Sequence, residues 1–133
     1  MKTLLLAFTL LFAAACNGDE SVAKYGAAGK VWTLTEMMGD PFIARATMEF
    51  GEDGRVSGKA PCNNYSAQQS VPYPWFKIGP VMSTKMACPD LQKETAFFAN
   101  LAKMTLSEVS GETLILSNDA GETMVFTAEY SAD

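Results

Sequence analysis

The chain has 133 residues, and its 15 acidic and 10 basic side chains give a formal net charge of −5 at pH 7. This acidic balance argues against nucleic acids and anionic lipid surfaces as partners. The sequence contains no histidine, which removes the commonest general base and the commonest metal ligand. We therefore expect a protein without cofactor or metal, and we assign no catalytic residue.

Residues 1–15 have the features of a secretory signal peptide. Lys2 gives a charged start, residues 3–12 are apolar, and small residues follow. The apolar run is shorter than the about 20 residues that a membrane-spanning helix needs. The signal ends in AAAC, which resembles the lipobox of bacterial lipoproteins, although its first alanine stands where a larger aliphatic residue is usual. We expect Cys16 to carry a lipid; an ordinary signal cut nearby would leave Cys16 as a free thiol.

The next segment, residues 16–29, is small and polar and predicts a flexible tether behind the lipidated N-terminus. Residues 30–130 then form one domain of ordinary size. We expect a protein of the bacterial cell envelope, held to the outer membrane through its lipid on the periplasmic or surface side.

Alternating apolar residues predict short strands in the first half of the domain. Residues 31–37 place Trp32 and Leu34 on one face of a strand. Residues 44–60 predict a hairpin, because Asp53-Gly54 is a dipeptide typical of tight turns.

Further strands are predicted over residues 64–69 and 75–84, the latter with Phe76 and Ile78 on one face and a bend at Gly79-Pro80. Near the end, residues 112–117 and 122–130 flank the turn sequence NDAG and predict a second hairpin. Its cross-strand apolar residues are Leu114, Leu116, Met124 and Phe126.

Residues 89–104 break this pattern and predict one α-helix inserted among the strands. Pro89 suits the first helical position, and Glu94 lies near the positive end of the helix dipole. The apolar residues that share one helical face are Leu91, Phe98, Leu101 and Ala102. About eight short antiparallel strands with frequent turns indicate a mainly β barrel or sandwich.

Two cysteines, Cys62 and Cys88, belong to the folded domain. Zinc would need about four clustered ligands, which two cysteines without histidine do not supply. A cysteine nucleophile would need a base, and histidine is absent. Copper(I) could bind methionine pairs such as Met82 and Met86, but methionine commonly fills cores. In an oxidising compartment we expect a Cys62–Cys88 disulfide.

The order of several motifs resembles the META domain, the HslJ-like family of bacterial envelope proteins. The motifs are Trp32-Thr33-Leu34, Gly54-Arg55-Val56-Ser57-Gly58, Cys62-Asn63-Asn64-Tyr65, Thr84-Lys85-Met86-Ala87-Cys88 and Leu114-Ile115-Leu116. The resemblance covers residues 29–128 and departs from the family at Ala60-Pro61, where glycine is usual. It implies a single lipocalin-like antiparallel barrel with a helix at one end. It also implies an envelope setting linked to heat stress and antibiotic tolerance, and no known reaction.

The sequence therefore predicts a lipid-anchored, non-enzymatic META-domain protein, acting as a monomer on an unknown protein or small-molecule partner. By analogy of architecture, the alternative is a carrier of a small apolar ligand inside the barrel. Asparagine also serves turns and threonine also suits strands, so a purely structural role stays open for the candidate binding residues. These candidates are Asn63, Asn64, Tyr65, Thr84 and Lys85.

Overall fold

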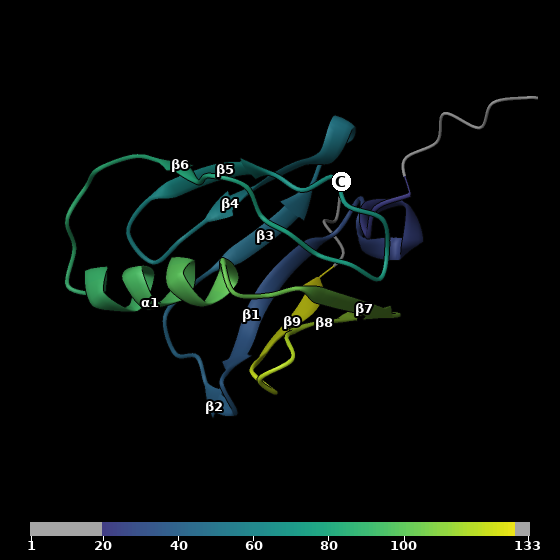
Figure 1. The fold of residues 1–133 in the computed structure, drawn as a ribbon. Coiled ribbons are helices and arrows are strands. Elements are labelled where there is room, and N and C mark those ends of the chain that lie inside the picture. Colours follow the sequence, from purple (N-terminus) through teal and green to yellow (C-terminus); the bar gives the residue numbers. More distant parts are fainter. Residues whose placement is uncertain (1–19, 130–133) are drawn as a thin grey trace, which may run out of the picture.

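A computed structural model describes residues 20–129 as an antiparallel sheet with one α-helix (Figure 1). Two helical turns, η1 (Ala23–Ala27) and η2 (Glu52–Gly54), accompany these elements. The helix is α1 (Leu91–Leu101). The nine strands in this part of the chain are β1 (Val31–Met37), β2 (Asp40–Pro41), β3 (Thr47–Phe50), β4 (Arg55–Lys59), β5 (Asn64–Gln68), β6 (Met82–Ser83), β7 (Leu106–Ser110), β8 (Thr113–Ser117) and β9 (Thr123–Glu129).

The strands follow the order β6-β5-β4-β3-β1-β9-β8-β7, with β2 paired to the end of β1. Within the described residues this path does not close, because β6 and β7 are not paired with each other. The mainly β antiparallel architecture is confirmed, whereas a closed barrel is not.

One connecting segment, between β5 and β6, touches both edges of the sheet. Phe76 N donates to Thr105 O beside β7 at 2.8 Å, and Gly79 N donates to Gln68 O in β5 at 2.8 Å.

The core follows the predicted alternation of apolar residues. Trp32 and Leu34 of β1 are buried, as the two-residue period of a strand requires. The predicted second hairpin is also confirmed, with Leu114 opposite Phe126 and Leu116 opposite Met124. Burying each such side chain stabilises the fold by roughly 1.5 to 3 kcal/mol, which is why the alternating pattern sets the strand register.

The helix is shorter than predicted, and the face that it buries shares only Leu101 with the predicted face. It begins at Leu91, after a turn at Pro89 and Asp90, and ends at Leu101 rather than at residue 104. Its buried residues are Glu94, Phe97 and Leu101. Leu91, which the sequence placed on the apolar face, is 41% exposed. The periodic pattern alone could not locate this face, because one buried position is occupied by a glutamate.

The strand predicted over residues 75–84 does not form as a whole. Only Met82 and Ser83 pair with β5, and Trp75 makes a single bridge to Leu106. Three prolines lie in or beside this stretch, at positions 72, 74 and 80, and each removes a backbone donor that a sheet ladder needs. Phe76 is nevertheless buried, so the segment is held by its side chain as well as by its few backbone bonds.

The tether predicted over residues 16–29 is wrong from residue 20 onward. Val22 and Ala27 are completely buried in the core, and the Trp32 indole N–H donates to Ala27 O at 2.8 Å. The ring of Tyr25 stacks on Tyr73 with 4.7 Å between centroids. A segment of small residues has the composition of a flexible linker. Here, however, the small side chains let the chain approach the sheet closely.

The predicted signal peptide and the predicted lipid attachment at Cys16 lie outside the described residues. Among the helices from residue 20 to residue 129, none is long and apolar enough to cross a membrane.

Candidate functional site

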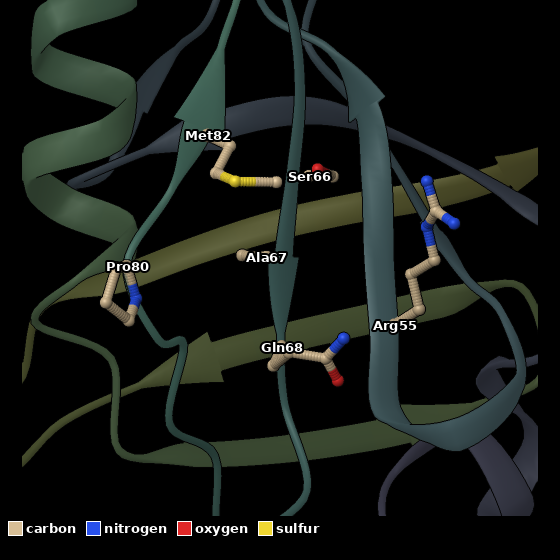
Figure 2. A pocket seen from close by; sticks show the side chains of 6 residues that line it. All are labelled: Arg55, Ser66, Ala67, Gln68, Pro80 and Met82. Carbon is tan, nitrogen blue, oxygen red and sulfur yellow. The ribbon is translucent and has the colours of Figure 1, made fainter.

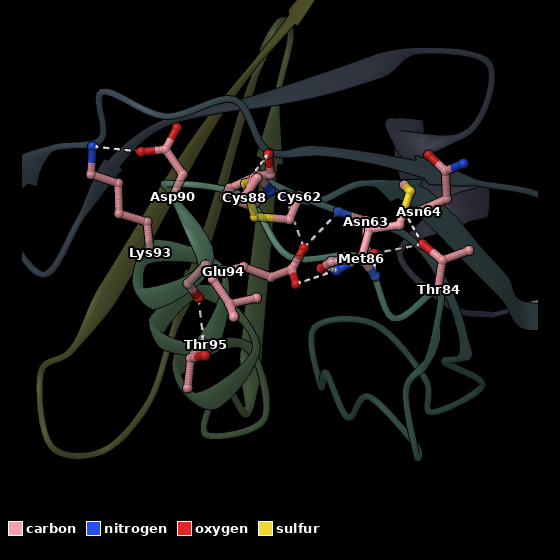
Figure 3. Close-up of a disulfide and its surroundings, with 12 residues drawn as sticks. Cys62, Asn63, Asn64, Thr84, Met86, Cys88, Asp90, Lys93, Glu94 and Thr95 are labelled. Carbon is pink, nitrogen blue, oxygen red and sulfur yellow. Dashed lines mark hydrogen bonds and ion pairs between the residues drawn. A yellow bond between two sulfur atoms is a disulfide. The ribbon is translucent and has the colours of Figure 1, made fainter.

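The predicted disulfide is confirmed and lies at the N-terminal end of α1 (Figure 3). Cys62 precedes β5 and Cys88 precedes the helix, and their Cα atoms are 5.7 Å apart. The bond therefore joins two segments that are separated by 26 positions in the sequence. Around it lies a network of buried polar groups that the disulfide alone would not explain.

Glu94 is the centre of this network. Its side chain reaches from α1 toward the turn before β5, and the residue is only 4% exposed. Oε1 accepts hydrogen bonds from the backbone N–H groups of Cys62 at 3.0 Å and Asn63 at 2.8 Å. Oε2 accepts from Asn63 Nδ2 at 2.7 Å (Figure 3). Three donors thus compensate the loss of water around the carboxylate.

Asn63 uses both ends of its buried amide to hold the segment after β6. Its Oδ1 accepts from Thr84 Oγ1 at 2.8 Å and from Met86 N at 2.7 Å. Its Nδ2 donates to Met86 O at 3.0 Å as well as to Glu94. The amide therefore bonds the backbone of Met86 as a strand would, and it holds the segment that follows the two residue pairs of the β5–β6 ladder.

The five predicted binding residues divide into buried and exposed groups. Asn63 and Tyr65 are buried and serve the packing. Asn64, Thr84 and Lys85 are exposed, and they lie close together because Thr84 N donates to Asn64 O at 3.1 Å. The disulfide and the asparagine network thus bring the predicted residues into one region but leave only these three on its surface.

Tyr65 is a core residue whose hydroxyl has a partner. It donates to Thr47 O at 2.6 Å, and its ring meets Phe97 and Phe98 edge to face at 5.6 and 5.4 Å. Burial raises the pKa of Tyr65, and the negative charge of Glu49 raises it further. The folded state therefore favours the neutral form of the Tyr65 side chain.

Replacing Tyr65 with phenylalanine should lower the free energy of unfolding by about 1 to 2 kcal/mol, because Thr47 O loses its donor. The same change should alter the response to alkali. The raised folded-state pKa leaves stability intact below about pH 10 and reduces it as pH rises further. Urea unfolding between pH 8 and pH 11 measures both effects. An unchanged alkaline slope in Tyr65→Phe would contradict this assignment.

Three open depressions surround the segment that begins at β6. One of about 330 Å³ is lined by Arg55, Ser66, Ala67, Gln68, Pro80 and Met82 (Figure 2). A second of about 360 Å³ shares Arg55, Ser66 and Met82 with it and continues to Ser83 and Thr84. A third of about 390 Å³ lies on the other side, between residues 83–87 and α1. Residues 82–84 are therefore the centre of the candidate binding surface.

Comparison with known proteins identifies the family. The META domain matches residues 26–131, which is most of the chain. The protein belongs to the META domain family. The predicted resemblance is confirmed, and the match begins within η1 rather than at residue 29. A search of curated protein sequences found no match.

Solved structures share the fold of this META domain at low sequence identity. A protein from Burkholderia xenovorans, solved by NMR, is 20% identical with a TM-score of 0.66, over 94% of this chain and 99% of the other. A DUF4847 family protein from Bacteroides vulgatus is 13% identical with a TM-score of 0.67, over 85% of this chain and 100% of the other. At these identities the likeness concerns the fold alone.

Two features of this META domain were not found from the sequence. Glu94 was interpreted as a helix-dipole residue, yet it binds the turn before β5. The methionines were interpreted as core residues, yet Met82 is 72% and Met86 is 60% exposed. The sequence pattern around these methionines is interrupted by prolines, so it did not indicate that their side chains are exposed.

Proposed function

We propose that this protein is a lipid-anchored, non-enzymatic META-domain protein of the bacterial cell envelope. It acts by binding a partner through the surface around residues 82–84, in envelope stress or antibiotic tolerance. The gathering of three open depressions at this short segment supports the binding role. The absence of histidine from the sequence supports a role without acid–base catalysis. The acidic net charge supports a monomer that avoids nucleic acid.

The same proposal includes a barrel-like closure made by the segment between β5 and β6. Its hydrogen bonds to both edges of the sheet support this, because they cover backbone groups that an open edge would expose. Among the fully buried side chains are three large aromatic ones, Trp32, Phe97 and Phe126. They occupy the core that an apolar ligand would have to enter, so the surface is favoured over the carrier alternative.

The anchoring part of the proposal predicts that Cys16→Ser loses its membrane attachment. The wild-type protein should enter the detergent-rich phase after phase separation, and the variant should remain in the aqueous phase, because acyl chains supply the binding energy. Blocking the lipoprotein signal peptidase should leave a larger precursor. A wild-type protein found in the aqueous phase would refute lipidation without affecting the binding surface.

A further inference from the structure

The depression beside α1 has the form of a groove between an edge segment and a helix. On one side lie the consecutive residues 83–87, and on the other lies one face of the helix. That face has the spacing i, i+3, i+4, i+7 and consists of Leu91, Glu94, Thr95 and Phe98. The groove measures about 390 Å³, and the buried residues Asn63 and Glu94 are among those that line it.

The edge segment offers backbone groups to this groove. Thr84 N bonds Asn64 O, and Met86 bonds the Asn63 amide through both its N–H and its C=O. In an extended chain the alternate residues point the opposite way, so Lys85 and Ala87 direct their backbone groups away from β5. Within residues 20–129 neither backbone N–H makes a hydrogen bond. An exposed edge of this kind is a template for another extended chain.

The walls of the groove set the chemistry of that chain. Met86 and Leu91 are 60% and 41% exposed, and Phe98 is half-buried, so the groove has apolar contact area. Glu94 is already compensated by three N–H donors. Asp90 and Lys93 form an ion pair at 3.2 Å. Lys85 is therefore the charged side chain of the groove lining that has no ion-pair partner within the described residues. Its positive charge favours an acidic group on the ligand.

We propose that this groove binds an extended acidic peptide segment, which adds a strand to residues 83–87 and places apolar side chains against α1. The inference rests on the proposed binding function and specifies its ligand class. Regularly spaced backbone donors and acceptors select a peptide over a lipid or a sugar, because only a second extended chain repeats the same spacing. The apolar wall and Lys85 then select valine-like and acidic side chains.

Fluorescence anisotropy with the full mature chain in detergent tests the proposal. The probe is a labelled hexapeptide of alternating valine and glutamate. A peptide with one methylated backbone nitrogen on its pairing edge should bind up to about tenfold more weakly, because one lost hydrogen bond is worth about one power of ten at most. A peptide with lysine in place of glutamate should also bind more weakly, and this difference should shrink in high salt.

Variants place the peptide in the groove. Lys85→Glu should reverse the preference between the glutamate and lysine peptides, and Thr95→Trp should block binding of both by filling the exposed helix wall. Lys77, which is also exposed but lies outside the groove lining, supplies the matched control: Lys77→Glu should leave both affinities unchanged. Circular dichroism of each variant confirms that its fold is retained.

Equal binding of the methylated and unmethylated peptides would overturn strand addition. Absence of binding at millimolar glutamate peptide would overturn the ligand class. Neither result would affect detergent partitioning, so failure of this inference and failure of the proposed anchoring are separable. Peptide binding by a chain that stays in the aqueous phase would keep the groove and remove the anchor.

Discussion

Glu94→Ala is expected to lower the free energy of unfolding by about 3 to 5 kcal/mol, because each buried donor left without a partner costs about 1 to 3 kcal/mol. The substitution removes the acceptors of Cys62 N, Asn63 N and Asn63 Nδ2 at one time. It also leaves a gap under the turn before β5. Urea unfolding measures the loss as a lower midpoint with an unchanged slope.

Two further variants separate the contributions to this loss. Glu94→Gln keeps one carbonyl oxygen for the two backbone donors, so it should cost less than half as much as alanine. Thr95→Ala removes a neighbouring helical side chain that is exposed and should change stability by less than about 0.5 kcal/mol. A cost below about 1 kcal/mol for Glu94→Ala would show that water replaces the carboxylate and that the network is not structural.

Replacing both Cys62 and Cys88 with alanine is expected to cost about 3.5 kcal/mol, the chain-entropy value for a loop of about 26 residues. This loss is a large share of a domain stability of about 5 to 15 kcal/mol. The fold should survive, because the strand register comes from the apolar alternation and not from the bond. Reductant added to the wild-type protein should reproduce the loss, and it should have no effect on the double variant.

The disulfide and the Glu94 network are expected to depend on each other. Cys62 contributes both its sulfur to the bond and its N–H to Glu94. The combined loss in a Cys62→Ala, Cys88→Ala, Glu94→Ala chain should therefore differ from the sum of the separate losses by more than about 0.5 kcal/mol. Additive losses would mean that the turn keeps its shape without either element. Alkylation of both thiols in unfolded, unreduced protein would contradict the bond itself.

Where one face of a strand is buried, the sequence was sufficient to predict it. Trp32 and Leu34 alternate with polar residues, and the β8–β9 hairpin carries apolar pairs on both strands, so packing and local preference agree there. The strand prediction for the segment between β5 and β6 was wrong as a whole, because Pro74 and Pro80 prevent a continuous ladder. Tertiary contacts nevertheless bury Phe76 there. The tether prediction was wrong for residues 20–29, because small residues occur both in flexible linkers and where the chain packs closely against a sheet.

The candidate site was predicted less completely, for a physical reason. The disulfide followed from the number and setting of the cysteines, and the family motifs marked Asn63 and Thr84. The role of Glu94 depends on backbone N–H groups 31 and 32 positions away, and no local pattern reports such a contact. The exposure of Met82 and Met86 likewise depends on where the sheet ends.

The packing of the chain from Glu20 onward determines how an anchored molecule would stand on its membrane. Tyr73 N donates to Glu20 O at 2.7 Å, so the folded body begins four residues after Cys16. Four extended residues reach at most about 14 Å. In Figure 1, η1 lies at one end of the molecule, and α1 and β6 lie toward the other. In a chain lipidated at Cys16, the short connecting segment would therefore keep the η1 end close to the bilayer. Its groove would face outward, toward partners that approach from the aqueous side.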